Sequence, residues 1–432
     1  MNNKSVCILA LLISLVSHAQ TGTWSGKLDV QGNSLSLVFH LDGDSPTMDS
    51  PDQGVKGIPV QVESVSGMIK VRIPSLGAVY EGVNLFNMIT GTFTQANISL
   101  PLTLVPGEVR PLRPQTPEGP YPYTVEEVSF RSGDIILNGS LVLPEGWTHE
   151  TPALLFVTGS GIQNRDEEIF GHKPFAVIAD AFARAGIATL RYDDRGFGVT
   201  GTDSSSWTVE DFRKDASSGM RVLREKFDKA GVLGHSEGGT IALMLAADQE
   251  ADFIISMAGM VISGAETLVE QNRTTLLSMG LPESVVSRYC TLLEKTFEVK
   301  VKGGIMPDPD NYDLPDELKR NYMAVSAQTD VPYIRHFINL DVRCDLGKIS
   351  CPVLALNGTK DIQVDYRLNL NALRDGLSSD LNARVEEAEG LNHLFQHCTT
   401  GAVSEYRTIE ETISEDVLKL MIQWISGLQL TI

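Results

Sequence analysis

The stretch that most constrains the fold is GVLGHSEGGTIALMLA, residues 231–246, in which a short apolar run stops at a glycine-lined corner and a helical pattern follows at once. The corner, GHSEG at 234–238, matches G-x-S-x-G. A serine at a strained turn between strand and helix holds its hydroxyl clear of the sheet, and flanking glycines avoid the clashes that side chains would make there. The positive end of the following helix also favours developing negative charge. The motif alone is weak, but in this setting it predicts that Ser236 is a nucleophile.

Strand-like and helical segments alternate on both sides of this corner, which indicates βαβ units and a mostly parallel sheet covered by helices on both faces. Residues 264–347 interrupt the alternation with amphipathic helical runs, and we expect them to form a lid over the carboxyl ends of the strands. The predicted strands are 126–132, 135–145, 153–159, 187–194, 230–236, 253–259, 351–358 and 383–390, and the predicted helices outside the lid are 175–186, 208–227, 238–248, 366–377 and 413–428.

The residues before this region follow another pattern. Residues 20–106 show rough apolar alternation broken by Gly, Asp and Pro, which predicts a small all-β sandwich or barrel with a structural or access-shaping role. Six prolines lie between 106 and 122, so residues 107–123 are expected to form a semi-rigid linker. A chain of 432 residues is long enough for two or three domains, and we place the second at 124–432.

The first residues are typical of a secretory leader. Lys4 supplies a positive charge, residues 7–16 are apolar, and Ser17-His18-Ala19 places small residues where a cleavage site needs them. We expect cleavage after Ala19 and a secreted or periplasmic protein. The apolar run is too short for a mature membrane anchor, and no other stretch of the sequence approaches transmembrane length.

The net charge limits the kinds of binding partner, and the cysteine content limits the kinds of metal, redox and disulfide site. The formal net charge is −20, which argues against binding to nucleic acid or to an anionic membrane surface. No CxxC pair is present, so we expect neither a zinc site nor a redox motif. In an oxidising compartment the four cysteines after the leader could form up to two disulfides in three connectivities, and spacing does not choose among them. They are Cys290, Cys344, Cys351 and Cys398.

A serine nucleophile needs a base and a carboxylate that orients the base, here in the chain order Ser, acid, His. Asp361 follows the strand 351–358, and His393 follows the last strand after a glycine turn. We expect Asp361 to accept the Nδ1–H of His393, whose Nε2 then accepts the serine proton. Asp365 is an alternative acid that we expect to begin a helix, and His397 is an alternative base.

Acyl transfer also needs donors for the oxyanion. The residue after the nucleophile supplies one backbone N–H, here Glu237, whose side chain is given no role. The second donor is expected to be the Ser160 N–H in the loop after the strand 153–159, with that of Gly161 as the alternative.

Three further polar features receive structural interpretations. His235, directly before the nucleophile, is expected to pack in the core or to hydrogen-bond locally. His172 lies in a loop after the first core strand, where contact with substrate is the alternative and we expect exposure to solvent. In RYDDRGFGVTG, residues 191–201, we expect Asp193 and Arg195 to brace the loop through a buried ion pair and backbone hydrogen bonds.

Five segments together resemble the α/β-hydrolase superfamily: TGSGIQNRDE, RYDDRGFGVTG, GHSEGG, NGTKDIQVD and GLNHLF occur in that family's order and at its spacings. More narrowly, the chain is similar to secreted bacterial serine esterases with a β-rich N-terminal domain. The resemblance implies an α/β-hydrolase fold with a helical cap and a triad of Ser236, Asp361 and His393. In one departure, Thr158 stands where many relatives carry histidine before the oxyanion glycine.

These features predict a carboxylic ester hydrolase that forms an acyl-enzyme on Ser236, acts on a small-molecule ester and needs no metal or organic cofactor. One alternative is a serine peptidase or aminopeptidase of the same fold. Another is a binding protein on an inert hydrolase fold, which the intact set of Ser, Asp and His disfavours. The acyl and alcohol groups depend on how residues 264–347 pack, which the sequence does not specify.

Overall fold

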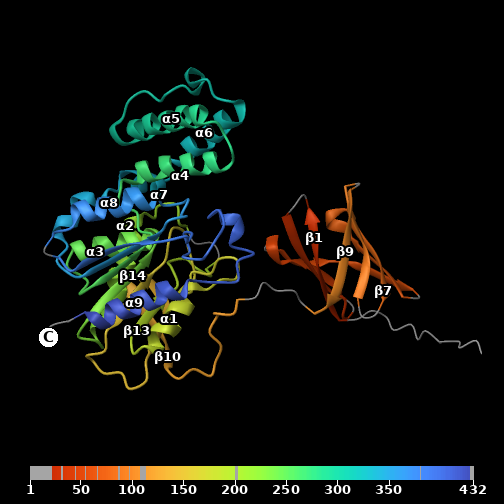
Figure 1. Ribbon diagram of the computed structural model, residues 1–432, viewed down its shortest axis with the longest axis horizontal. Helices are drawn as coiled ribbons and strands as arrows, with labels where there is room; N and C mark the ends of the chain where they lie inside the picture. Colours follow the sequence, from red (N-terminus) through yellow and green to blue (C-terminus); the bar gives the residue numbers. More distant parts are fainter. Residues whose placement is uncertain are drawn as a thin grey trace, which may run out of the picture. The chain divides into compact units, whose positions relative to one another are not determined.

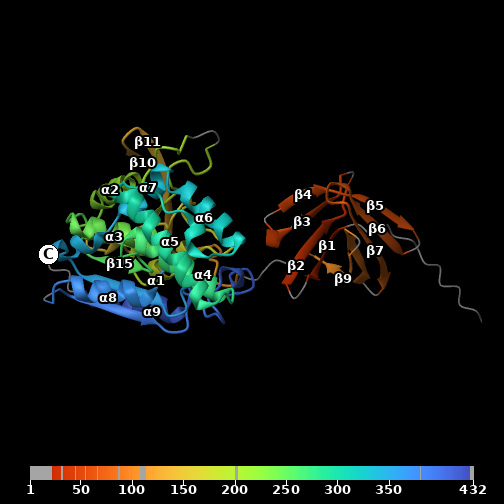
Figure 2. The same cartoon turned by 90° about the horizontal axis from the view of Figure 1, so that it is seen from above.

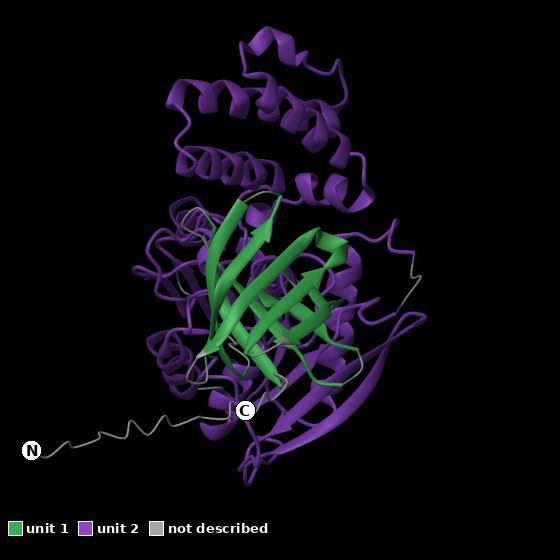
Figure 3. Cartoon of the chain, turned by 90° about the vertical axis from the view of Figure 1, so that its right-hand side faces the viewer, with its two compact units in different colours: residues 1–112 green, residues 113–432 purple. Residues whose placement is uncertain are grey.

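The computed structural model divides the chain into two compact units, residues 1–112 and 113–432 (Figure 3). The predicted leader, residues 1–19, and residues 108–112 of the predicted linker lie outside the described residues. The residues that the structure describes are 22–30, 33–43, 45–53, 55–65, 67–85, 88–96, 98–107, 113–199, 203–379 and 381–428.

The described part of the first unit is an antiparallel sheet of nine strands, in the order β4-β3-β2-β1-β9-β8-β7-β6-β5. The two edge strands, β4 and β5, are joined through the single residue Val60, so the sheet must curl until its edges meet (Figure 2). Curling encloses one apolar core that includes Phe39, Val71 and Tyr80, and it protects the edges from pairing with other chains. The all-β prediction for this unit is confirmed. The strands are β1 (Thr23–Val30), β2 (Asn33–His40), β3 (Thr47–Ser50), β4 (Val55–Pro59), β5 (Gln61–Val65), β6 (Met68–Ile73), β7 (Ala78–Leu85), β8 (Met88–Gln95) and β9 (Ile98–Pro106).

The second unit is built on an eight-stranded sheet in the order β10-β11-β13-β12-β14-β15-β16-β17. The pairings β10–β11 and β11–β13 are antiparallel, and the remaining pairings are parallel. Every residue of β12 is buried, as expected of a parallel strand covered on both faces. The strands are β10 (Thr124–Ser132), β11 (Ile135–Leu143), β12 (Ala153–Val157), β13 (Ala188–Tyr192), β14 (Ala230–His235), β15 (Ile254–Met257), β16 (Val353–Gly358) and β17 (Ala383–Ala388).

Helices cover both faces of this sheet. Because successive strand residues point to opposite faces, Leu154 and Phe156 join one apolar cluster with residues of α1 (Pro174–Arg184) and α9 (Glu415–Gly427). The alternate residues of β12 join a second cluster on the other face. There they pack with residues of α2 (Val209–Arg224), α3 (Glu237–Ala247) and α8 (Tyr366–Gly376). The predicted α/β-hydrolase fold is confirmed.

Between β15 and β16 the chain leaves the sheet and forms a helical cap, seen beyond one end of the sheet in Figure 1. The cap has a small core of its own, which includes Tyr289, Leu293 and Phe297, so its helices support one another as well as packing on the sheet domain. Its helices are α4 (Gly264–Ser278), α5 (Glu283–Lys302), α6 (Asp316–Gln328) and α7 (Pro332–Asn339).

The second half of the predicted linker packs on the second unit instead of spanning open solvent. Arg113 Nη1 donates to the Ile409 carbonyl at 2.8 Å, and Gln115 Nε2 donates to the Ile413 carbonyl at 2.8 Å. The many prolines correctly predict that residues 113–123 form no helix. They do not predict the hydrogen bonds that the polar residues between them make.

The four cysteines after the predicted leader are free thiols in this structure, which forms none of the disulfides considered above. Cys290 is buried in the cap core, whereas Cys344 is exposed. Within the described residues, no helix combines the length and the apolar character needed to cross a bilayer.

Candidate active site

Ser236 occupies a strained corner between β14 and α3. Its φ of 54° and ψ of −118° lie in a region that residues other than glycine rarely adopt, and such strain clusters at functional sites. The backbone is held there by a hydrogen bond from the Ser236 N–H to the Met257 carbonyl at 2.8 Å. Ser236 is partly exposed, while His235 and Glu237 on either side are buried. The corner therefore presents one hydroxyl to a ligand.

The glycines of the corner are required by close backbone approach. A Cβ on Gly234 would lie 1.9 Å from the Gly238 carbonyl oxygen, and a Cβ on Gly238 would lie 2.0 Å from that of Val157. Both contacts are far inside van der Waals distance and involve backbone, which cannot move aside cheaply. The G-x-S-x-G pattern is thus a steric requirement of packing this turn against β12.

Asp361 and His393 meet as the sequence analysis predicts. His393 Nδ1 lies 2.6 Å from Asp361 Oδ2, and both side chains are buried. The other carboxylate oxygen accepts the backbone N–H groups of Gln363 at 2.8 Å and Val364 at 3.0 Å. A carboxylate fixed in this way accepts the Nδ1 proton and leaves Nε2 of His393 as the basic nitrogen.

The two alternative residues lie apart from this pair. Asp365 is the N-cap of α8, where its Oδ1 accepts the Leu368 N–H at 2.8 Å. The His397 side chain is 67% exposed and pairs with Glu411 at 2.9 Å. Neither residue lines the cavity that Ser236 and His393 share, so Asp365 and His397 lie outside this site.

Ser236 and His393 line one cavity of about 350 Å³. The cap closes part of it, because Leu268 of α4 and Tyr333 and Phe337 of α7 also line it. Mostly apolar walls with a few convergent polar groups are typical of small-molecule sites.

The loop after β12 brings Ser160 beside the start of α3. Ser160 Oγ donates to Glu237 Oε2 at 3.2 Å, and the Tyr333 hydroxyl donates to the same oxygen. Burial raises the pKa of Glu237 to about 7, against the opposing effect of these two donors. The Glu237 side chain, for which the sequence predicts no role, therefore links the cap to the residues that carry both predicted oxyanion donors.

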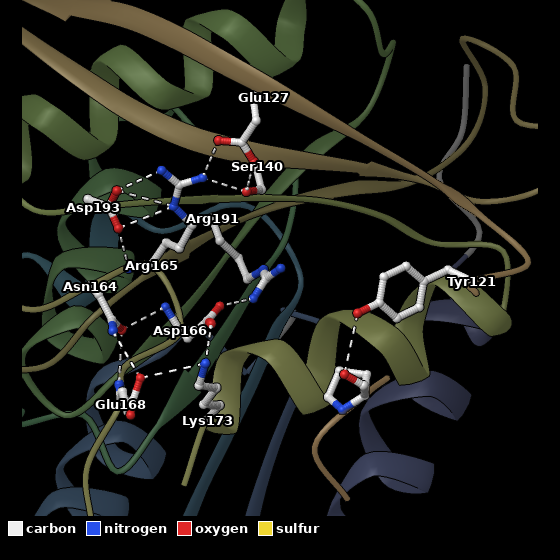
Figure 4. Close-up of polar contacts among 11 residues, drawn as sticks. Tyr121, Glu127, Ser140, Asn164, Arg165, Asp166, Glu168, Lys173, Arg191 and Asp193 are labelled. Atoms are coloured by element: carbon white, nitrogen blue, oxygen red, sulfur yellow. Dashed lines mark hydrogen bonds and ion pairs between the residues drawn. The ribbon is translucent and has the colours of Figure 1, made fainter. Parts of the chain in front are cut away.

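Ion pairs fasten the rest of this loop to neighbouring strands, as Figure 4 shows. Arg165 pairs with Asp193 at 2.6 Å and with Glu127 of β10 at 2.7 Å, and Asp166 pairs with Arg191 of β13. The loop is thus held from several sides, which preorganises the backbone that follows β12.

The predicted bracing of residues 191–201 takes a different form. Asp193 and Arg195 do not pair with each other: Asp193 holds Arg165, and Arg195 pairs with the buried Asp215 of α2 at 2.7 Å. Thr158 donates to Asp194, whose pKa is raised to about 8 by burial. Asp193 and Arg195 both follow the end of β13, yet each pairs with a residue from a different part of the fold. Their spacing in the sequence does not predict these partners.

The prediction that His172 is exposed is wrong. Its ring is buried, with Nε2 2.8 Å from the Tyr406 carbonyl oxygen and Nδ1 3.0 Å from Thr412 Oγ1. Burial lowers the pKa of His172 to about 4. Both hydrogen-bond partners come from the segment between β17 and α9. The sequence near residue 172 therefore cannot predict them.

His235 makes two hydrogen bonds that join separate parts of the site. Its Nδ1 lies 2.9 Å from Glu167 Oε1, and its Nε2 lies 2.9 Å from the carbonyl oxygen of His393. Glu167 Oε1 also accepts the Gly159 N–H at 2.8 Å. The expected local hydrogen-bonding role of His235 extends to residues far away in the sequence.

Comparison with known proteins adds to this geometry. The family described as serine aminopeptidase, S33, matches residues 173–397. Esterase EstD of Thermotoga maritima is 29% identical over 282 residues, which is 63% of this chain and 62% of that protein. Serine hydrolase BPHL of Homo sapiens is 27% identical over 177 residues, which is 40% of this chain and 53% of that protein. The chain thus spans less than two thirds of the length of either relative.

Solved structures with likeness to the chain include Est1E from Butyrivibrio proteoclasticus, with 18% identity and a TM-score of 0.40 over 70% of this chain and 99% of the other. Proline iminopeptidase from Mycobacterium smegmatis shows 16% identity and a TM-score of 0.44 over 70% of this chain and 98% of the other.

Proposed function

The chain belongs to the serine aminopeptidase S33 family of the α/β-hydrolase superfamily, and from this premise we propose that it is a serine hydrolase that cleaves carboxylic esters through an acyl-enzyme on Ser236. One observation supports this most strongly. The serine at the strained corner shares a cavity with His393, whose Nδ1 lies 2.6 Å from the buried Asp361 carboxylate. An imidazole oriented in this way through Nδ1 can take a proton from a hydroxyl at Nε2.

In the acylation step, Ser236 Oγ attacks the ester carbonyl carbon while His393 Nε2 accepts the hydroxyl proton. Asp361 stabilises the resulting imidazolium. The backbone N–H groups of Glu237 and Ser160 donate to the oxyanion of the tetrahedral intermediate. When the intermediate collapses, the alcohol leaves with the proton that His393 returns to it.

Deacylation repeats the sequence with water as the nucleophile. His393 removes a proton from a water molecule that attacks the acyl carbon of the ester formed by Ser236. The second tetrahedral intermediate uses the same two donors and then releases the carboxylic acid. The proton returns from His393 to Ser236 Oγ, so the cycle consumes only ester and water.

An ester substrate is favoured over a peptide with a free amino terminus. An aminopeptidase must bind an ammonium group, for which a carboxylate in the cavity is the natural partner. Among the lining residues that the structure describes, Glu167 is the one that carries a carboxylate, and it is already engaged by Gly159 and His235. The name of the relative from Thermotoga maritima, an esterase, agrees with this choice.

A direct comparison of aryl acetates with aminoacyl arylamides tests the proposal. We expect turnover of the acetates and a much lower kcat/KM for the amides, and we expect Ser236→Ala to lower ester turnover by about 10⁴-fold or more. A clear preference for the amides would establish the peptidase instead. Full ester turnover by the alanine variant would remove Ser236 from the mechanism.

The cavity volume sets the expected acyl size. A space of about 350 Å³ is at the small end of ligand pockets, which suits small to medium acyl groups against the apolar side chains of the cap. In a panel of aryl esters of graded acyl length, kcat/KM is expected to peak at short to medium chains. A peak at long-chain esters would contradict the assignment of this cavity.

We also propose that residues 1–19 are a cleaved leader and that the enzyme works outside the cytoplasm. The positive Lys4, the apolar residues 7–16 and the small residues at the predicted cleavage site support this. The intact mass of protein recovered from the periplasm or the culture medium is expected to match a chain that begins at Gln20. A cytoplasmic protein that retains residues 1–19 would overturn the proposal.

A further inference from the structure

Beside the acid–base pair lies a second buried pair of a histidine and a carboxylate. His235 is 5% exposed and Glu167 is 4% exposed, and the two side chains meet at 2.9 Å between Nδ1 and Oε1. The other ring nitrogen, Nε2, lies 2.9 Å from the carbonyl oxygen of His393. Each nitrogen of His235 therefore faces an oxygen acceptor.

This arrangement determines where the protons are. A backbone carbonyl can only accept, so Nε2 of His235 must carry a hydrogen. We assign the proton between Nδ1 and the carboxylate to the ring, because an imidazole is a stronger base than a carboxylate. With both nitrogens protonated, His235 is an imidazolium paired with the Glu167 carboxylate.

The electrostatics of the pocket agree with that state. Burial opposes a positive charge on His235, but the adjacent Glu167 carboxylate and the carbonyl of His393 outweigh it, so its pKa is raised. Asp361 also contributes to raising this pKa, and the His393 ring lies with its centroid 4.7 Å from that of His235.

The pair also ties together three backbone segments: the loop after β12, the end of β14 and the loop that carries His393. Glu167 Oε1 accepts the N–H of Gly159, the residue before Ser160, at 2.8 Å. Glu167 itself has a φ of 53°, in the left-handed region, so the loop bears some strain to aim its carboxylate inward. Through His235 this carboxylate reaches the residue before the nucleophile and the backbone of the catalytic base.

We propose that His235 and Glu167 are positioning residues. They form a buried ion pair that holds the loop with Gly159 and Ser160, and the backbone of His393, in place relative to Ser236. This inference rests on the proposed ester hydrolysis at the same site. The pair neither attacks substrate nor relays the serine proton, because both nitrogens of His235 are committed to acceptors. It acts by setting the places of the groups that do.

The protonation state can be measured without any substrate. In wild-type protein labelled with ¹⁵N-histidine, His235 is expected to show two ring N–H resonances at pH 7.5, identified by their loss in His235→Gln. In Glu167→Gln, His235 is expected to keep the Nε2 proton and to lose the Nδ1 proton at this pH. A single ring N–H on His235 in the wild type would overturn the ion pair.

Kinetics then test the positioning role. A misplacement of reacting groups by about 1 Å can cost about 10²-fold in rate. We therefore expect Glu167→Gln to lower kcat for an aryl acetate by about 10²-fold with little change in KM. The matched control is Glu168→Gln in the same loop, whose carboxylate is 41% exposed and pairs with Lys173 at 3.7 Å; it should leave kcat unchanged.

Failure of this inference and failure of the proposed function give different results. If the wild type hydrolyses no ester, the proposed function fails, and the ring N–H resonances still decide the ion pair. If the wild type is an active esterase and folded Glu167→Gln retains full kcat, the positioning role alone is wrong. Because the ring N–H spectrum is recorded without substrate, every outcome decides at least one of the two claims.

Discussion

Two buried pairs of a histidine and a carboxylate lie side by side in this site, and we propose different tasks for them. His393 faces Asp361 at 2.6 Å and His235 faces Glu167 at 2.9 Å, in each case through Nδ1. The difference is at Nε2. In His235 that nitrogen is bound to a carbonyl oxygen, whereas His393 lines the cavity with Ser236. In the proposed mechanism, the partner of Nε2 therefore distinguishes the imidazole that moves protons from the one that holds structure.

The largest effect is expected from removing the proton-moving ring. His393→Ala should lower kcat by about 10⁶-fold, the scale seen when the base of a serine triad is lost. His235→Gln should cost far less, because it disturbs positions and leaves the base in place. Steady-state kinetics with an aryl acetate measure both. Equal losses in the two variants would show that the distinction between the pairs is false.

The next effect concerns the carboxylate that orients the base. Asp361→Asn should lower kcat by about 10⁴-fold, because an amide that donates to Nδ1 selects the wrong tautomer of His393. Its fold should be retained, since the backbone N–H groups of Gln363 and Val364 can still donate to the amide oxygen. Circular dichroism with kinetics checks this. A loss below tenfold would mean that another acid orients the base.

A smaller effect is expected in how the free energy of unfolding depends on pH. Because the pKa of His235 is raised in the folded protein, its contribution to stability is fully present below the unfolded value of about 6.5 and is lost as pH rises through the folded value. Breaking a buried pair by neutralising one partner costs about 3 kcal/mol. The stability gap between wild type and Glu167→Gln should therefore be largest between about pH 5 and 6.5 and shrink in alkali. Urea unfolding at a series of pH values measures this difference in free energy. A difference that grows as pH rises would contradict the assignment of His235 as an imidazolium.

The smallest effect is expected from substituting His397, the exposed residue that the sequence offers as an alternative base. His397→Gln should change kcat by less than twofold and the free energy of unfolding by less than about 0.5 kcal/mol, because exposed ion pairs such as that with Glu411 contribute little. The same assays apply. A loss near that of His393→Ala would reverse the choice between the two histidines.

The sequence predicts one of these pairs and not the other, for a physical reason. Ser236 ends one predicted strand, Asp361 and His393 lie three residues beyond two others, and parallel strands bring their carboxyl ends to one edge of the sheet. The structure places all three there. Glu167 lies in the middle of a loop, and its partner His235 is 68 residues away, so no local pattern links them.

Other contacts escaped prediction in the same way. The link from Glu237 to the cap depends on how Tyr333 of α7 packs, and the burial of His172 depends on the segment before α9. Strand and helix patterns report which face of an element is apolar, and they predicted the sheet and its covering helices well. They carry no information about polar side chains that meet between loops.

Labelling with a fluorophosphonate followed by peptide mapping tests the central claim most directly. The account predicts one adduct per folded wild-type chain, on Ser236, formed at least about 10³-fold more slowly in His393→Ala because the hydroxyl then lacks its base. An adduct on another residue, or ester turnover that survives with Ser236 unlabelled, would contradict the account.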